Sequence, residues 1–301
     1  MKDVYQLTDL ESRERLDEGE DKPAKLAVIG WPVAHSASPQ MHQPALDALG
    51  IHSRYIRVEV PEGRCPEAFD RMRELGFIGC NITVPHKFAA HAYCDEIDAT
   101  AEALGTVNTI RFDKSINRGF NTDGPGFANA IEQEFGCKLE NMDVVIAGAA
   151  GGAGQAIATH SMLAGVRKLV LINRTRDKLD LLVEHLHQTN PKANIVPLGF
   201  DSPDLAMHCR SSQLIINTSS VGLKEGDGSI LPAECLKTEH WIYDTIYQPS
   251  RTPLLELAEK IGAKTANGLS MLIHQGAISF QHWFNGTEPM PFMRQAVSPQ
   301  P

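Results

Sequence analysis

The spacing of apolar and polar residues predicts alternating strands and helices from about residue 24 onward. Apolar runs typical of buried strands occupy residues 24–30 and 77–83, and residues 53–60 alternate between apolar and polar side chains. Residues 39–49 and 65–75 have helical spacing, and each stretch is followed by a glycine. This order predicts an α/β domain with a mainly parallel sheet.

A second α/β series begins at residues 143–165, where an apolar run leads into a glycine-rich turn and then an Ala-rich helical stretch. Glycines in such a turn let backbone amides approach a pyrophosphate, which the helix N-terminus stabilises. Further strands are expected at residues 168–172, 194–198, 213–217 and 241–245, the last taken as the final strand. The pattern predicts a Rossmann-like, doubly wound dinucleotide-binding domain.

Arg174 follows the second strand of this series, about twenty residues after the glycine turn, where the ribose-reading residue is expected. A carboxylate at this position would bind a ribose 2′-hydroxyl, whereas a guanidinium offers donors to a 2′-phosphate. The sequence therefore favours NADP over NAD. Ala149 stands where the first glycine of the G-x-G-x-x-G pattern is expected, and an alanine fits the turn only if its φ stays negative.

Polar side chains follow the predicted strands of the first domain. Ser36 and Ser38 follow the first strand; Ser38 precedes Pro39 and is expected to cap the next helix, whereas Ser36 has no capping role and is a candidate ligand-binding residue. Asn108 lies in a predicted strand at residues 104–110, where a buried amide needs a hydrogen-bonding partner, either a hydroxylated ligand or the backbone.

Lys87 follows Pro85 at the start of a helix predicted over residues 88–97. A lysine is electrostatically unfavourable at a helix N-terminus, so it is either an ordinary surface residue or a proton donor to a carbonyl that is being reduced. Asp123 is either a turn residue or, if it lies near Lys87, its acid–base partner. Tyr247 and Gln275 are open in the same way between packing and ligand binding.

Composition narrows the partners to small molecules. The formal charge of −9 argues against nucleic acid or an anionic membrane as partner, and no apolar stretch is long enough to span a bilayer. The six cysteines are scattered without a C-x-x-C pair, so we expect no metal site and a cytoplasmic protein with reduced thiols. Residues 1–23 are rich in charge and predict a solvated leader, a candidate for disorder.

Eight motifs occur in the order found in the shikimate dehydrogenase family, which this sequence resembles from about Lys25 to Phe284. They are Ser36-Ala37-Ser38-Pro39, Asn81-Ile82-Thr83-Val84-Pro85-His86-Lys87, Gly105-Thr106-Val107-Asn108-Thr109, Asn121-Thr122-Asp123-Gly124, the glycine turn, Asn173-Arg174-Thr175, Tyr243-Asp244 with Tyr247, and Met271 to Gln275. The sequence departs from the family at Trp31, where a small polar residue is usual, and at Ala149.

The resemblance implies NADP-dependent, reversible reduction of 3-dehydroshikimate to shikimate in aromatic amino-acid biosynthesis, with Lys87 and Asp123 as the catalytic pair. It implies that residues 24–122 with 268–301 form the substrate domain, that residues 123–267 form the NADP domain, and that the C-terminal helices return to the substrate domain. The implied substrate-binding residues are Ser36, Ser38, Asn81, Thr83, Lys87, Asn108, Asp123, Tyr247 and Gln275. The predicted cofactor-binding residues are Gly148, Ala149, Ala150, Gly151, Gly152, Ala153, Asn173, Arg174, Thr175, Thr218, Ser219 and Gly268.

Other functions remain open at this point. A paralogue that acts on quinate or aminoshikimate would retain nearly all of these residues. A binding module without turnover is disfavoured because Lys87 and Asp123 are both present. The sequence leaves a monomer and a homodimer as alternatives.

Overall fold

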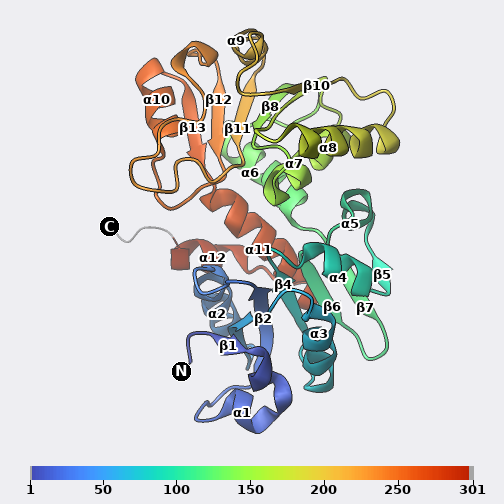
Figure 1. Ribbon diagram of the computed structural model, residues 1–301. Helices are drawn as coiled ribbons and strands as arrows, with labels where there is room; N and C mark the ends of the chain where they lie inside the picture. Colours follow the sequence, from blue (N-terminus) through green and yellow to red (C-terminus); the bar gives the residue numbers. More distant parts are fainter. Residues whose placement is uncertain (1, 298–301) are drawn as a thin grey trace. The chain divides into compact units, whose positions relative to one another are not determined.

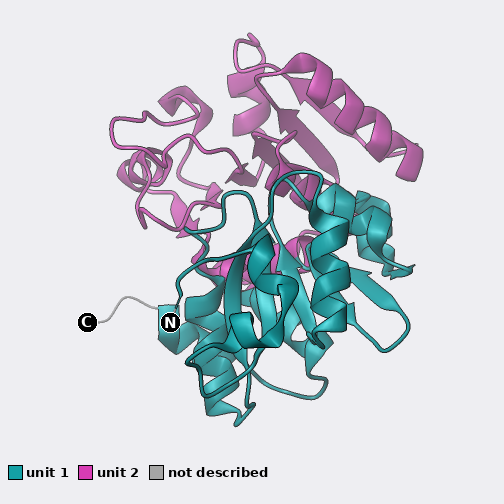
Figure 2. Ribbon diagram, turned by 60° about the horizontal axis from the view of Figure 1, so that its bottom comes forward, with its two compact units in different colours: residues 1–122, 273–301 teal, residues 123–272 magenta. Residues whose placement is uncertain are grey.

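The computed structural model describes residues 2–297, and the chain divides into two compact units (Figures 1 and 2). Unit 1 comprises residues 1–122 with 273–301, and unit 2 comprises residues 123–272. The division at 272/273 differs from the expected domain boundary at 267/268, and it falls inside helix α11 (Leu269–Trp283). Residues 1 and 298–301 of the expected domains lie outside the described residues.

Unit 1 is built on a seven-stranded sheet of order β1-β3-β2-β4-β6-β7-β5. Its strands are β1 (Tyr5–Gln6), β2 (Ala24–Gly30), β3 (Arg54–Glu59), β4 (Gly79–Ile82), β5 (Glu96–Ile97), β6 (Thr109–Phe112) and β7 (Asn117–Phe120). The pairs β1–β3, β3–β2, β2–β4 and β5–β7 are parallel, whereas β4–β6 and β6–β7 are antiparallel. The sheet is therefore mainly parallel with an antiparallel insertion.

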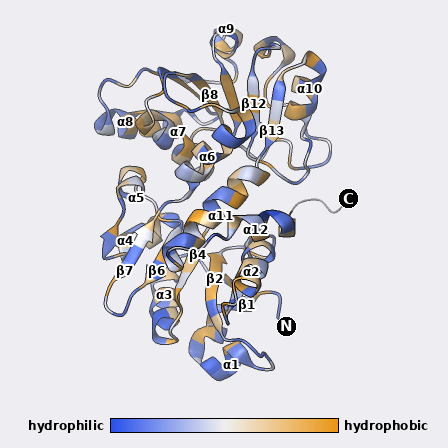
Figure 3. Ribbon diagram, turned by 180° about the vertical axis from the view of Figure 1, so that it is seen from behind, coloured by the Kyte–Doolittle hydropathy of each residue, from blue (hydrophilic) through white to orange (hydrophobic). Residues whose placement is uncertain are grey.

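Helices pack on both sides of this sheet. They are α1 (Arg13–Asp17), α2 (Ser38–Ala48), α3 (Cys65–Glu74), α4 (Lys87–Tyr93), α5 (Ala99–Leu104) and α12 (Met290–Val297), preceded by the 3-10 helix η1 (Leu7–Glu11). Helix α12 lies beside α2 although the two are far apart in the sequence (Figure 1). Figure 3 shows the apolar character of β2, which is buried almost throughout.

The expectation of a disordered leader is wrong for residues 2–23. Leu10 and Leu16 are buried in the core of unit 1, and β1 pairs with β3. The buried guanidinium of Arg54 donates to the carbonyl of Leu16 and to the carboxylate of Asp17, each at 2.8 Å. A buried guanidinium requires hydrogen-bond acceptors, and residues 16 and 17 supply acceptors to Arg54 of β3.

Two other local predictions are also wrong. Residues 99–104 form α5, which Asp98 caps by accepting from the amide of Ala101 at 2.7 Å and which ends at Gly105 with φ +62°, so the strand expected from residue 104 begins only at Thr109. The helix expected over residues 88–97 ends at Tyr93, and Glu96 and Ile97 form β5.

Unit 2 has a fully parallel six-stranded sheet of order β10-β9-β8-β11-β12-β13. The strands are β8 (Asp143–Ala147), β9 (Lys168–Ile172), β10 (Ile195–Leu198), β11 (Leu214–Asn217), β12 (Trp241–Asp244) and β13 (Lys264–Asn267). The order is that of a Rossmann fold, whose ligands bind at the carboxyl ends of the strands where the strand order reverses. Strand β13 corrects the expectation that β12 is the last strand.

The helices of unit 2 connect these strands. They are α6 (Asp123–Phe135), α7 (Gly152–Leu163), α8 (Arg176–Thr189), α9 (Leu205–Arg210), the 3-10 helix η2 (Ala233–Cys235), α10 (Pro253–Ile261) and the first part of α11. None of the helices in residues 2–297 combines the length and apolar character that crossing a membrane requires. Over the same residues, no cluster of three histidine, cysteine or acidic side chains is suited to hold a metal ion.

Candidate active site

Ser36 and Ser38 lie together just after β2. The Ser36 hydroxyl donates to the Ser38 hydroxyl at 3.2 Å and accepts from the Ser38 amide at 3.3 Å. Ser38 is the first residue of α2 and does not cap it, so the expected capping role of Ser38 is wrong. Ser36, for which no such role was expected, accepts from the backbone amide at the start of the helix. The guanidinium of Arg57 holds this turn through two hydrogen bonds to the Ser36 carbonyl, at 2.8 and 3.0 Å.

Asn81, at the carboxyl end of β4, is the centre of a buried polar network. Its carbonyl oxygen accepts from the Tyr55 hydroxyl at 2.6 Å, and its amide donates at 3.0 Å to the hydroxyls of Thr109 and Ser279. Tyr55 is fully enclosed, and burial raises the pKa of its phenol well above the ordinary value. These bonds fix which end of the Asn81 amide is the donor and which the acceptor.

Asn108 belongs to the same network through Thr122. Its amide donates to the Thr122 hydroxyl at 3.0 Å, and its oxygen accepts from the Thr122 backbone amide at 2.9 Å. The Ser279 hydroxyl lies 2.8 Å from that of Thr109 and 3.1 Å from that of Thr122. Sequence reasoning did not single out Tyr55 or Ser279, and it named Thr109 only as the last residue of a family motif, because the proximity of these residues depends on strand register and on the return of α11 to unit 1.

Lys87 is the first residue of α4, and its backbone carbonyl accepts from the Val107 amide at 3.1 Å. The neighbouring His86 is buried, and its Nε2 lies 2.8 Å from the Val60 carbonyl, which anchors the start of the helix to the end of β3. Burial lowers the pKa of His86. Thr83 packs against the backbone at Gly30, where an added Cβ would lie 2.5 Å from the Thr83 methyl group.

The remaining predicted substrate residues are divided between the units. Gln275 lies on α11 in unit 1, and its carbonyl accepts from the Ser279 hydroxyl at 2.9 Å. Asp123 opens α6 as the first residue of unit 2, directly after Thr122, and is not in the turn expected for it. Tyr247 follows β12 in unit 2 and is half-buried, which raises the pKa of its phenol. The pairing of Lys87 with Asp123 therefore remains a prediction.

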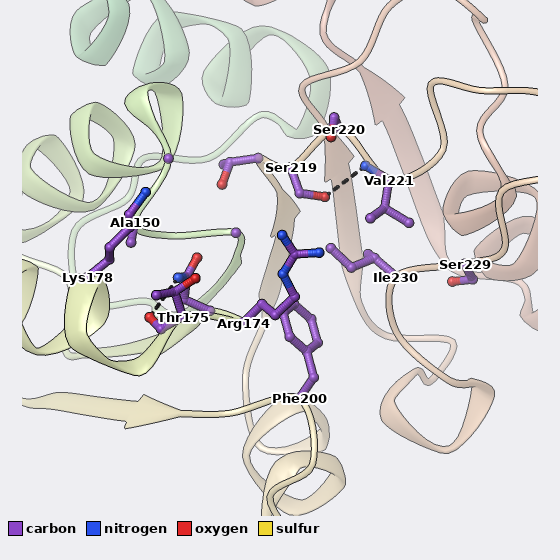
Figure 4. Close-up of a pocket in the computed structure, with 14 residues that line it drawn as sticks. Ala150, Arg174, Thr175, Lys178, Phe200, Ser219, Ser220, Val221, Ser229 and Ile230 are labelled. Carbon is purple, nitrogen blue, oxygen red and sulfur yellow. Dashed lines mark hydrogen bonds between the residues drawn. The ribbon is translucent and has the colours of Figure 1, made fainter.

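A pocket of about 680 Å³ opens in unit 2 at the carboxyl ends of β8, β9 and β11 (Figure 4). The residues that line it are Gly148, Ala150, Gly151, Asn173, Arg174, Thr175, Lys178, Phe200, Thr218, Ser219, Ser220, Val221, Ser229 and Ile230. Eight of these were predicted to bind a cofactor. Of the other four predicted residues, Gly152 and Ala153 form the first turn of α7, Ala149 is fully buried, and Gly268 packs against the backbone of Thr245; none of the four lines the pocket.

The turn between β8 and α7 places its glycines where side chains would not fit. Gly148 has φ +83°, and a Cβ there would lie 2.8 Å from the Cβ of Ser219. A Cβ on Gly154 would lie 2.6 Å from the carbonyl oxygens of Gly148 and Ala149. Ala149 does not have a positive φ, so Gly148 takes the left-handed position and the departure at Ala149 leaves the turn intact.

Two cations line this pocket beside the turn. Arg174 follows β9, and in Figure 4 its guanidinium points toward the loop that carries Ser219. Lys178 is one turn into α8, three residues after Thr175. Within residues 2–297 neither forms an ion pair, whereas the adjacent Arg176 is paired with Asp180 at 2.9 Å. The glycine turn, the helix start and the two cations together suit a dinucleotide with an additional phosphate.

Family models match both ends of the chain. Residues 28–110 match the shikimate dehydrogenase substrate binding domain, and residues 268–297 match the shikimate 5′-dehydrogenase C-terminal domain. The NADP-dependent shikimate dehydrogenase of Symbiobacterium thermophilum is 38% identical over 286 residues, which cover 90% of this chain and 92% of the relative.

Solved structures with the same fold include relatives bound to both kinds of ligand. Shikimate 5-dehydrogenase from Thermus thermophilus, in complex with NADP(H) and shikimate, is 34% identical with a TM-score of 0.78, covering 91% of this chain and all of that one. Quinate dehydrogenase from Corynebacterium glutamicum, in complex with NAD, is 28% identical with a TM-score of 0.83, covering 92% of this chain and 99% of that one.

Proposed function

Because this chain belongs to the shikimate dehydrogenase family, we propose that it catalyses the reversible, NADP-dependent reduction of 3-dehydroshikimate to shikimate. The reaction is a step of aromatic amino-acid biosynthesis through chorismate. The observation that carries the cofactor choice is the position of two cations, Arg174 and Lys178, beside the glycine turn of the unit 2 pocket; among the described residues neither has an ion-pair partner. An enzyme specific for NAD would be expected to carry a carboxylate at the Arg174 position.

The cofactor would lie along the unit 2 pocket. The backbone of Gly148 to Gly151 and the first turn of α7 would hold the pyrophosphate, and Arg174 and Lys178 would bind the 2′-phosphate. NADPH, when bound, supplies the hydride that reduces the ring carbonyl. The cradle left by Gly148 and Gly154, which side chains would fill, supports this assignment.

The substrate would bind to the polar side chains of unit 1. Ser36 and Ser38 offer adjacent hydroxyls for the carboxylate, while Asn81, Thr83, Asn108 and Gln275 offer donors and acceptors for the ring hydroxyls. Tyr247 and Asp123, which belong to unit 2, are further substrate-binding residues of this proposal. The bonds that orient Asn81 and Asn108 mean that little reorganisation is needed when the substrate binds.

Lys87 would act as the proton donor in the reduction. As the carbonyl carbon accepts a hydride, the oxygen gains negative charge, and the Lys87 ammonium would stabilise this charge and transfer a proton to it. Asp123 would orient the ammonium and balance its charge. In the reverse direction, neutral Lys87 would remove the proton from the alcohol.

Initial rates of oxidation test this function, with shikimate or quinate as substrate and NADP or NAD as cofactor, followed by absorbance of the reduced nicotinamide. We expect activity with shikimate and NADP to exceed that of every other combination. Preference for quinate and NAD would assign the chain to the catabolic branch of the family, and absence of turnover in all four assays would contradict an enzymatic function. We further propose a cytoplasmic location and a monomer or homodimer, which fractionation and sedimentation would check.

A further inference from the structure

Asp244, the last residue of β12, is a fully buried carboxylate outside the residues assigned to catalysis. Within residues 2–297 it has no ion pair with a lysine, arginine or histidine, and burial raises its pKa. It accepts hydrogen bonds from three groups instead: the side-chain amide of Asn217 at 3.1 Å to each oxygen, the hydroxyl of Thr252 at 2.6 Å, and the backbone amide of Ile246 at 3.0 Å. All of these partners are donors, which suits an ionised carboxylate.

The first of these bonds leads to the cofactor pocket. Asp244 accepts only, so the Asn217 amide must turn its nitrogen toward Asp244 and its oxygen away. That oxygen accepts from both the backbone amide and the hydroxyl of Ser219, at 2.9 and 2.8 Å. The same Asn217 nitrogen donates to the Val221 carbonyl at 3.1 Å. Ser219 and Val221 both line the pocket, so the orientation of one buried amide sets the shape of its wall.

Asp244 makes its other two hydrogen bonds with Thr252 and Ile246, which do not line the pocket. The Thr252 hydroxyl donates to Asp244 and also accepts from the Leu255 amide at 3.4 Å, which caps α10. The Ile246 amide fixes the backbone immediately before Tyr247. The Asp244 carboxylate thus connects three segments: the loop after β11, the loop after β12 and the start of α10.

We propose that Asp244 is a positioning residue that holds the pocket wall at residues 217–221 in its cofactor-binding conformation through Asn217, and that it sets the backbone leading to Tyr247. The inference rests on the proposed function, because it assumes that the unit 2 pocket binds NADP(H). A carboxylate that only stabilised the fold would leave affinity for NADPH unchanged in the molecules that remain folded.

The variant Asp244→Asn tests this inference with almost no change of volume. Whichever way its amide turns, an NH2 group would replace one of the two oxygens that lie 3.1 Å from the Asn217 nitrogen, so two donors would face each other there and the hold on the Asn217 amide would weaken. We expect the dissociation constant for NADPH, measured by nicotinamide fluorescence without substrate, to rise about tenfold or more, as expected for loss of a buried hydrogen bond to a charged group. The KM for NADP should rise in parallel.

Ile242→Val, in the same strand, is the matched control. Ile242 is fully buried and belongs to the core cluster on the face of the sheet that α10 covers, so the variant should lower Tm by a few degrees without touching the network. We expect its dissociation constant for NADPH to equal that of the unsubstituted protein. A weakened affinity of the same size as in Asp244→Asn would mean that general destabilisation accounts for both, and would overturn the proposal.

Asn217→Ala keeps the proposal testable if Asp244→Asn does not fold. It removes the hydrogen bonds that link Asp244 to Ser219 through Asn217, and it retains the hydrogen bonds from Thr252 and Ile246 to Asp244. Its affinity for NADPH should fall as in Asp244→Asn; affinity within twofold of the unsubstituted protein, in either folded variant, would overturn the inference. Failure of the proposed function is distinguishable, because the unsubstituted protein would then bind no NADPH or show no turnover of shikimate.

Discussion

The two proposed ligand sites are organised in different ways. In unit 1, the polar residues hold one another through their side chains, as Asn81 does with Tyr55, Thr109 and Ser279. In unit 2, the pocket lies beside a turn whose backbone is shaped by glycine, with Gly148 at φ +83° and α7 beginning at Gly152. Its two cations, Arg174 and Lys178, have no ion-pair partner within residues 2–297.

This difference matches the two ligands proposed. A small ring with several hydroxyls is distinguished from its analogues by single hydrogen bonds, so each donor and acceptor must be fixed before binding. A pyrophosphate is held by backbone amides and a helix terminus, and an extra phosphate by flexible cations. Substitutions in unit 1 should therefore act on the substrate and on chemistry, and substitutions in the unit 2 pocket should act on the cofactor.

Lys87→Ala should have the largest effect and would test whether chemistry depends on unit 1. We expect kcat for shikimate oxidation to fall by about 10³-fold or more, about 4 kcal/mol of lost transition-state stabilisation, while the dissociation constant for shikimate changes little. Lys114→Ala, at an exposed lysine of the same unit, is the control and should leave kcat unchanged. Turnover by Lys87→Ala close to that of the control would remove Lys87 from the reaction.

Gly148→Ala tests whether backbone shape governs the unit 2 pocket. The new Cβ would lie 2.8 Å from the Cβ of Ser219 at a residue with φ +83°, so we expect affinity for NADPH to fall by at least about tenfold. Gly136→Ala is the matched control, because Gly136 has φ +69° but open space around its Cβ position. Both variants should lose about 1–2 kcal/mol of stability from the left-handed backbone, but only Gly148→Ala should lose cofactor affinity; equal affinities would contradict this account.

A smaller effect is expected from acid, and it should act on unit 1. His42 is fully buried and stacked on Tyr55 with ring centroids 4.5 Å apart. Neither of its ring nitrogens has a hydrogen-bond partner in the part of the chain that the structure describes, and burial lowers its pKa from 6.5 to about 3. The unfolded chain therefore binds a proton that the folded chain excludes. Its contribution to stability is complete above pH 6.5 and is lost as the pH falls toward about 3.

Between pH 6.5 and about 5, this histidine should remove about 2 kcal/mol of unfolding free energy. Denaturant unfolding of the protein and of His42→Leu across that range measures the difference. The variant should show the shallower pH dependence by about that amount, and parallel curves would show that His42 is already protonated or solvated in the folded state.

The sequence predicted the frame of both sites but not the contacts within them. Strand β2 was predicted at its observed ends because a mainly apolar stretch of seven residues, with Lys25 as its one charged member, is followed by a turn. Gly148 and Arg174 could be placed for a similar reason, since a strand, a glycine turn and the next strand fix their positions in any Rossmann fold.

The contacts that were missed join distant parts of the chain. Tyr55 reaches Asn81 only because β3 and β4 both flank β2, and Ser279 reaches Asn81 only because α11 returns across 198 residues. Residues 2–23 look solvated by composition alone, and their order depends on distant partners: the buried Arg54, strand β3 and the core of unit 1. Local spacing does not contain this information, because it depends on which strands become neighbours.

The most direct test of the division between the units is a crossed set of KM values for shikimate and NADP in Ser38→Ala and Arg174→Ala. We expect Ser38→Ala to raise KM for shikimate by about tenfold and leave KM for NADP within twofold. Arg174→Ala should do the reverse, and should leave KM for NAD unchanged because NAD has no 2′-phosphate. If both variants raise both constants to a similar extent, the two ligands are not divided between the units as proposed.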